Sequence, residues 1–288
     1  MAAGAIVGDH ASMTSRSFVQ VDVFSATPFR GNPLAVVLDG DGLSTEQMQR
    51  FANWTNLSET TFVLPPTTPS ADYRVRIFTP SEELPFAGHP TIGTCHAWLA
   101  RNPQHAADSV VQECGAGLIT LRRTGDRFAF AAPPLLRDEP VEEELQVRIA
   151  SGLGIERAAI RDARWVDNGP GWVAVLLDSA QAVLDLRPVA VDSALGVVGP
   201  YPAGAPHAIE VRAFIPKAGA TDEDPVTGSL NAGLALWLGR TGRVDMPYVA
   251  HQGTALGRDG RVHVDQDPDG TIWIGGDVVT CVRGNVAF

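Results

Sequence analysis

Two pairs of residues stand where a loop leads into an apolar helix, and their types suit the binding of an anion. The first pair is Gly88-His89 and the second is Gly228-Ser229. The first turn of a helix offers backbone N–H groups and the positive end of the helix dipole, and glycine lets a ligand approach the backbone closely. The two pairs therefore predict a cradle for a carboxylate. The local pattern alone also fits a simpler interpretation, in which Ser229 caps its helix and Gly88 only makes a turn.

The sequence lacks several motifs that are typical of cofactor, nucleophile and metal sites, and their absence narrows the possible reactions. Gly115-Ala116-Gly117 begins a dinucleotide fingerprint but leads into a strand and has no third glycine. Gly228-Ser229 does not form a nucleophile elbow, and no Walker lysine follows a glycine cluster. His89 and His96 share one helix without a carboxylate at ligand spacing. The sequence predicts neither a cofactor nor a metal.

The chain contains an internal repeat with a period of 140 residues. Four pairs keep this register, namely Pro85 and Pro225, Gly88 and Gly228, Gly93 and Gly233, and Gln112 and Gln252. A period this long indicates duplication of a whole domain rather than a solenoid. If a pseudo-two-fold axis relates the copies, the two glycine junctions face one cleft.

Each half follows a similar plan of strands and helices. Alternating and β-branched residues predict strands over 19–24, 35–38, 60–64, 73–78 and 172–177, and a hairpin of 118–121 with 127–131. Helices are predicted over 44–52, where Ser44 opens a capping box, and over 90–101, 142–151 and 229–238. The last is apolar on all sides and must be buried. The fold class is α+β: two pseudo-symmetric halves, each a curled, mostly antiparallel sheet around one buried helix. The halves span 17–132 and 133–274, after a flexible extension over 1–16.

Composition excludes several classes of partner. The 288 residues carry a formal charge of −11 and no cluster of Lys or Arg, which argues against nucleic acid. No apolar run approaches the roughly 18 residues that a membrane helix needs, and the N-terminus lacks a signal-peptide pattern. Three cysteines at irregular spacings favour a reduced, cytoplasmic protein.

The same stretches carry a family resemblance. From about Ser17 to its end, the chain resembles the PhzF-like family of phenazine biosynthesis, whose motifs occur here in order: 21–24 with 28–33, 58–62, 78–80 with 83–91, 223–229, and 252–253 with 257–258. Val226 departs from the motif, which usually has a smaller residue there. The resemblance implies an isomerase with the duplicated diaminopimelate epimerase-like fold, in which residues 275–288 return to the first half. It also implies a homodimer.

The resemblance further assigns roles to residues of this chain. It implies an acid/base glutamate at Glu59, catalytic partners at Asp224 and His89, and substrate contacts at Ser58, Gly88, His89, Gly228 and Ser229. Moving a proton between carbons needs one group that acts first as base and then as acid, with a pKa raised by burial. Without the resemblance, the sequence favours a surface residue after a helix at Glu59, and Asp224 and His89 fit a turn residue and a satisfied polar group at a helix start.

The positions before the two glycines separate this chain from thiol-using relatives. Diaminopimelate epimerase and proline racemase share the fold but use paired cysteines there, whereas this chain has Ala87 and Thr227. Neither residue can supply a thiolate, so a two-thiol racemase is excluded. The cysteines of this chain lie elsewhere, at positions 95, 114 and 281.

Three hypotheses about function remain. The first is a cofactor-independent isomerase that shuttles a proton on a small carboxylate-bearing, or cyclic amino acid-like, metabolite. The second is a lyase or dehydratase that uses the same base, since expulsion of a neighbouring hydroxyl begins with the same proton. The third is a non-catalytic metabolite-binding protein, which a retained buried base disfavours.

Overall fold

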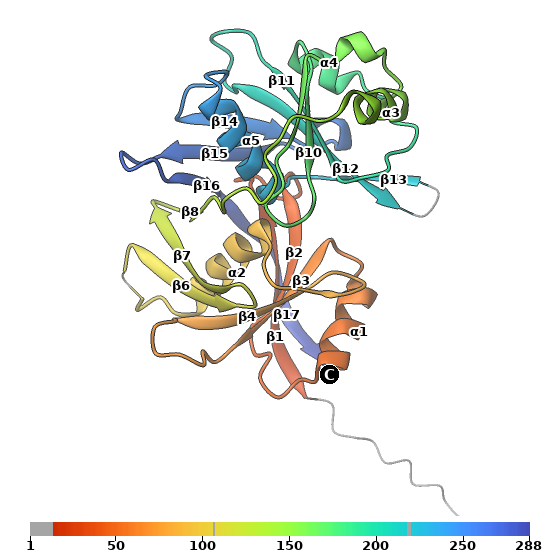
Figure 1. Ribbon diagram of the computed structural model, residues 1–288. Helices are drawn as coiled ribbons and strands as arrows, with labels where there is room; N and C mark the ends of the chain where they lie inside the picture. Colours follow the sequence, from red (N-terminus) through yellow and green to blue (C-terminus); the bar gives the residue numbers. More distant parts are fainter. Residues whose placement is uncertain (1–13, 106, 218–219) are drawn as a thin grey trace, which may run out of the picture.

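The protein consists of two α+β halves placed one above the other (Figure 1). The computed structural model describes residues 14–105, 107–217 and 220–288. The extension predicted over 1–16 therefore lies mostly outside the described residues, and the first strand begins at Ser15.

The first half winds its strands around one central helix. Its elements are, in order, β1 (Ser15–Val23), β2 (Asn32–Val37), α1 (Thr45–Thr55), β3 (Glu59–Leu64), β4 (Tyr73–Phe78), β5 (Glu83–Leu84), α2 (Gly88–Arg101), β6 (Ser109–Cys114), β7 (Gly117–Thr124) and β8 (Arg127–Ala131). The predicted capping box is present, because the Ser44 hydroxyl accepts from Gln47 N and the Gln47 side chain accepts from Ser44 N. The strand predicted over 35–38 begins three residues earlier than expected, at Asn32.

The second half repeats this order. After the additional helix α3 (Glu143–Leu153) and the 3-10 turn η1 (Arg157–Ala159), its elements are β9 (Asp162–Trp165), β10 (Val173–Leu176), α4 (Ala180–Leu184), β11 (Leu195–Pro200), β12 (Ile209–Lys217), β13 (Ala220–Asp224), α5 (Gly228–Arg240), β14 (Tyr248–Gln252), η2 (Thr254–Leu256), β15 (Gly260–Gln266) and β16 (Ile272–Gly276). The last strand, β17 (Val278–Ala287), lies beside β1 in the first half.

Strand pairing confirms the duplication. In the first half β2 and β3 pair in parallel across α1, and in the second half β10 and β11 pair in parallel across α4. The parallel pairs β4–β6 and β12–β14 likewise span the two central helices α2 and α5. The hairpin of β12 and β13 is longer than that of β4 and β5.

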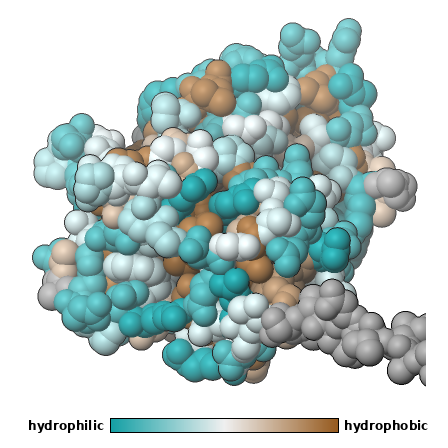
Figure 2. Space-filling view, turned by 90° about the horizontal axis from the view of Figure 1, so that it is seen from below, coloured by the Kyte–Doolittle hydropathy of each residue, from teal (hydrophilic) through white to brown (hydrophobic). Residues whose placement is uncertain are grey.

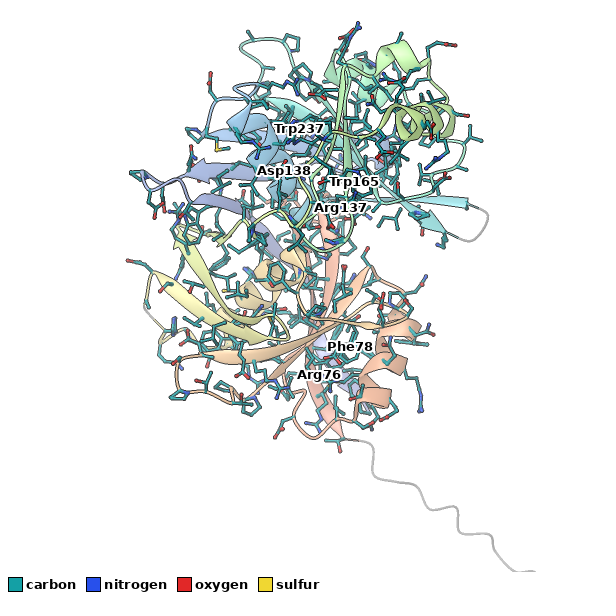
Figure 3. The ribbon with its side chains drawn as sticks, viewed as in Figure 1. Arg76, Phe78, Arg137, Asp138, Trp165 and Trp237 are labelled. Carbon is teal, nitrogen blue, oxygen red and sulfur yellow. The ribbon has the colours of Figure 1, made fainter. Side chains whose placement is uncertain are left out.

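Two antiparallel pairings join the halves. The C-terminal strand β17 runs back along β1 from Ala287 to Val278, and β8 pairs with β16. The connector between the halves is held at Asp138, which accepts from Arg164 Nε at 2.6 Å and from Arg240 Nη2 at 2.8 Å. The guanidinium of Arg137 stacks 3.5 Å from the Trp165 ring centre, as the labelled side chains in Figure 3 show.

Each central helix packs against a strand or turn so closely that glycine is required. A Cβ on Gly93 of α2 would lie 2.7 Å from Leu34 Cδ2, and a Cβ on Gly233 of α5 would lie 2.5 Å from Val166 O. Both distances are shorter than carbon contacts allow. The repeated glycines of the sequence are therefore explained by packing inside the two halves.

The face shown in Figure 2 is mostly hydrophilic. Figure 2 views the molecule from the side of the first half and shows apolar groups only in scattered patches between hydrophilic ones. Among the described residues, no helix combines the length and the apolar character needed to span a membrane.

Candidate active site

The N-termini of the two central helices meet at the boundary between the halves. A Cβ on Gly228 would lie only 3.3 Å from Gly88 Cα and 3.4 Å from His89 N, so α2 and α5 begin almost in contact. The N-cap residues are Ala87, which has no polar side chain, and Thr227, whose hydroxyl donates to Asp224 at 2.6 Å instead of capping. The two positive helix ends therefore face the same place without side-chain caps.

Glu59 lies at this place. It is the first residue of β3, and its side chain is 16% exposed. Its Oε2 is 3.2 Å from Nε2 of His89, the second residue of α2, whose side chain is 6% exposed. Within the described part of the chain neither atom has a well-oriented hydrogen bond, so the two groups are close but are not locked to each other.

Burial shifts the pKa of both groups toward their neutral forms. Burial raises the pKa of Glu59 from 4.5 to about 8, and the nearby charge of Asp224 adds to this rise. Burial lowers the pKa of His89 from 6.5 to about 3. At neutral pH the imidazole is therefore uncharged and the carboxyl is mostly protonated, so the 3.2 Å contact is not an ion pair. A carboxyl that titrates near neutral pH can both accept and return a proton.

Asp224, the last residue of β13, is fixed by both halves. Its Oδ2 accepts from the Thr227 hydroxyl at 2.6 Å, and its Oδ1 accepts from Asn32 Nδ2 at 2.9 Å. Burial raises the pKa of Asp224 to about 6, although these two hydrogen bonds oppose the rise. The Asn32 amide also donates to Val226 O at 2.9 Å and lies 3.4 Å from His89 Nδ1. Asn32 thus connects the carboxylate of one half to the imidazole of the other.

Two glutamines support the helix starts in the same way. Gln252 accepts from Thr227 N at 3.0 Å and donates to Thr227 Oγ1 at 2.9 Å. Gln112 donates to Thr91 Oγ1 at 3.0 Å and accepts from the Tyr73 hydroxyl at 2.9 Å. Sequence reasoning gave Asn32 and these glutamines no role. The repeat register of Gln112 and Gln252 was the available signal.

Ser229 and Ser58 occupy different surroundings. The Ser229 hydroxyl accepts from Trp172 Nε1 at 2.9 Å, and its carbonyl accepts from Asn168 Nδ2 at 2.9 Å. Since Thr227 holds the N-cap position, Ser229 is not the cap of α5. Ser58 is exposed and directly precedes Glu59. The structure therefore brings Glu59, His89 and Asp224 together beside both glycines, with Ser229 in the first turn of α5.

A cavity of about 670 Å³ lies at the other end of α5. It is lined by residues that include Leu135, Leu236, Arg240, Met246 and Gln266. Since the 13 residues of α5 span about 20 Å, this cavity is a helix length away from Glu59. We place the candidate site at the helix starts because the buried titratable groups converge there.

The cysteines are poor nucleophiles in this structure. Cys95 is fully buried inside α2, and burial raises its thiol pKa well above the usual value. Burial also raises the pKa of Cys114 and Cys281. The residues before the two glycines are Ala87 and Thr227, so neither helix start carries a thiolate.

This fold and site define a duplicated α+β protein of the diaminopimelate epimerase-like class. The model of the PhzC-PhzF family of phenazine biosynthesis-like proteins matches residues 21–284. "Antisense-enhancing sequence 1" of Schizosaccharomyces pombe is 36% identical over 94% of this chain and 99% of that protein. The trans-2,3-dihydro-3-hydroxyanthranilate isomerase of Pseudomonas chlororaphis is 34% identical, also over 94% of this chain and 99% of that protein.

A solved structure shares the fold over nearly the whole chain. The PhzF-family phenazine biosynthesis protein of Bacillus anthracis superposes with a TM-score of 0.82 and 24% identity, over 95% of this chain and 99% of that one. The chain belongs to the PhzC-PhzF family and is an isomerase, which confirms the resemblance and the fold expected from the sequence.

Proposed function

We propose that the protein is a cofactor-independent isomerase in which Glu59 moves a proton between carbons of a small, carboxylate-bearing metabolite. One observation carries this proposal. A buried carboxyl with a pKa of about 8 lies 3.2 Å from a neutral imidazole where two uncapped helices begin.

The helix starts suit the part of the substrate that carries negative charge. The backbone N–H groups of the first turns of α2 and α5 favour a carboxylate. Glycine at both positions lets the two helix starts lie this close together, since a Cβ on Gly88 would lie 2.8 Å from Phe130 Cζ and one on Gly228 would lie 3.3 Å from Gly88 Cα. The same positive ends stabilise the charge that develops on the substrate once a proton has left the neighbouring carbon. Gly88, Gly228 and Ser229 are the substrate-binding residues in this proposal.

Glu59 acts twice in the proposed reaction. As carboxylate it takes a proton from a C–H bond, whose electron pair passes into the conjugated system of the substrate. As carboxylic acid it then returns the proton to a different carbon, so atoms and charge balance within one turnover. The charge of Asp224 favours the protonated form of Glu59, and the neutral imidazole of His89 lies within reach of the carboxyl to orient it or to donate to the substrate.

The substrate of a relative gives the first compound to test. The Pseudomonas chlororaphis protein is named for trans-2,3-dihydro-3-hydroxyanthranilate, a cyclic, amino acid-like carboxylate. That compound and other small cyclic amino acids should be incubated with the protein in D₂O and followed by proton NMR and mass spectrometry. Isomerisation conserves the mass of the compound apart from deuterium exchange, whereas elimination loses water, so the same measurement distinguishes a dehydratase.

The test of the base is Glu59→Gln, which keeps the size of the side chain and removes its acid/base capacity. Turnover should fall by at least ~100-fold, the low end for general acid–base catalysis. Glu82→Gln makes the same chemical change at an exposed position and is the matched control. A Glu59→Gln protein with nearly normal turnover contradicts the proposal.

The proposal includes a cytoplasmic homodimer that binds neither nucleic acid nor membrane. The acidic composition and the PhzF-like resemblance support it. Light scattering on the purified protein measures the oligomeric state directly.

A further inference from the structure

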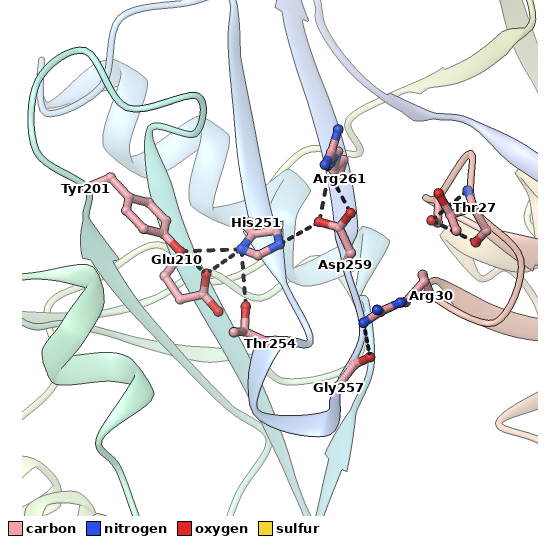
Figure 4. A network of polar contacts seen from close by, with 10 residues as sticks. Thr27, Arg30, Tyr201, Glu210, His251, Thr254, Gly257, Asp259 and Arg261 are labelled. Atoms are coloured by element: carbon pink, nitrogen blue, oxygen red, sulfur yellow. Dashed lines mark hydrogen bonds and ion pairs between the residues drawn. The ribbon is translucent and has the colours of Figure 1, made fainter.

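A second cluster of polar groups lies in the second half and shares no residue with the candidate site. His207 comes from the loop between β11 and β12, His251 from β14, and Asp259 from the segment before β15. One potential ligand atom of each lies within 4.8 Å of those of the other two. Figure 4 shows His251 and Asp259 at the centre of a network of hydrogen bonds.

Buried groups around His251 fix its orientation. Its Nδ1 lies 2.9 Å from Glu210 Oε2, and Glu210 is fully buried on the neighbouring strand β12. The Tyr201 hydroxyl donates to the same carboxylate oxygen at 2.7 Å. A carboxylate that accepts from one nitrogen of an imidazole leaves the other nitrogen facing away from it and free to bind. Most histidines that bind metals have such a partner on their second nitrogen. His251 Nε2 accordingly points at Asp259 Oδ1, 2.9 Å away.

The other two residues also present a ligand atom. Arg261 Nη2 donates to Asp259 Oδ2 at 3.0 Å, and Arg261 Nε makes a longer contact of 3.4 Å with Oδ1, the oxygen that faces His251. The ring of His207 stacks on that of His251, with centroids 4.4 Å apart and planes 6° from parallel. The buried Nδ1 of His207 has no hydrogen-bond partner in the described part of the chain.

We propose that His207, His251 and Asp259 bind a divalent transition-metal ion of the zinc type. Two imidazoles and one carboxylate suit zinc, whereas magnesium and calcium prefer oxygen ligands throughout. Tetrahedral zinc ligands lie roughly 3.3 Å from one another. His251 and Asp259 are already near this separation, so the main adjustment is a rotation of His207 on its loop. Solvent completes the fourth position.

The ion has a structural role in this proposal. The backbone N–H of Asp259 donates to Arg30 O at 2.7 Å, and Arg30 Nη1 donates to Gly257 O at 2.9 Å, so this segment joins the two halves. His251 directly precedes Gln252, which supports the start of α5. A bound ion would hold the segment against the sheet without touching Glu59. The sequence predicted no metal because the three ligands lie 44 and 8 residues apart and match no known spacing.

The experiment is a titration of tag-free protein, treated with chelator and dialysed, with Zn²⁺ in a calorimeter. We expect one equivalent of Zn²⁺ to bind, no binding of Mg²⁺, and a visible absorption band of four-coordinate Co²⁺ when Co²⁺ replaces Zn²⁺. His207→Ala and Asp259→Asn should each weaken Zn²⁺ binding by at least ~100-fold, and Tyr201→Phe, which frees the supporting carboxylate, by ~10-fold.

His105→Ala removes a histidine outside the cluster and is the matched control. Circular dichroism on each variant establishes that it is folded. The proposal is overturned if the wild-type protein binds no Zn²⁺, if it binds Mg²⁺ equally well, or if folded His207→Ala and Asp259→Asn proteins keep wild-type affinity.

Discussion

Replacing Glu59 by Gln should abolish a loss of stability that the folded protein undergoes as the pH rises. The ordinary pKa of this carboxyl is 4.5, and in the folded protein it is about 8. Below pH 4.5 both the folded and the unfolded chain hold the proton, so the carboxyl does not change the free energy of unfolding there. Between these values the unfolded chain releases the proton while the folded chain keeps it, and the free energy of unfolding therefore falls with rising pH. Above pH 8 both states are ionised and the loss is complete.

The structure sets the size of this effect. A pKa difference between 4.5 and about 8 corresponds to at most about 5 kcal/mol of unfolding free energy. The side chain keeps 16% exposure, and water at the exposed part lowers the cost of ionisation, so we expect about 2 to 4 kcal/mol. Gln is neutral at every pH and fills the same space. The variant should therefore be more stable than the wild-type protein at pH 8 and nearly equal to it at pH 4.5.

Urea unfolding of both proteins at several values between pH 4.5 and pH 8 measures this difference by linear extrapolation. The gap between Glu59→Gln and wild type should grow steadily with pH. Glu82→Gln, which changes an exposed carboxyl, should follow the wild-type curve throughout. If the wild-type and Glu59→Gln curves run parallel, Glu59 is not held neutral by burial, and the argument for its role as a proton shuttle loses its basis.

Two further outcomes follow from the same site. The value of kcat/KM should rise with pH toward about 8, because Glu59 must be ionised to accept a proton. Asp224→Asn should move this rise to lower pH by about one unit, because the variant lacks a charge that raises the pKa of Glu59. An unmoved profile would show that burial alone sets that pKa. Treatment with iodoacetamide should leave turnover intact, because neither helix start carries a thiol; alkylation confirmed by mass spectrometry, with loss of turnover in a folded protein, would contradict this.

Local signals in the sequence predicted the elements that position the site. The capping box at Ser44 fixed the start of α1, and the alternation over 73–78 gave the bounds of β4. The register of Gly88 with Gly228 marked the starts of both central helices, which the predicted ranges 90–101 and 229–238 placed within two residues. These signals are local or repeated, so they can be recognised without knowledge of distant contacts.

These signals could not predict contacts between residues that lie far apart in the sequence. No local pattern marks Asn32, but its side-chain amide donates to Asp224, which lies 192 positions away in the other half. His207 and Asp259 are unremarkable singly and acquire a potential role only because β12, β14 and β15 pair side by side. Such roles depend on strand order, which no local pattern of residues contains.

The duplicated frame is symmetric, whereas the chemistry proposed for it is not. Glu59 is the first residue of β3, where the parallel pairing with β2 begins, and the corresponding residue of β11 is the buried Leu195. The thiol-using relatives place one base at each helix start and so can act on both faces of a carbon, as racemisation requires. Asp224, the other buried carboxyl of the site, is held by Thr227 and Asn32, so Glu59 alone moves the proton and can return it only on the face that it contacts. The second half supplies instead a helix start, and Asp224, whose charge raises the pKa of Glu59. This division of roles fits an isomerase that transfers a proton between two carbons better than one that inverts a single centre.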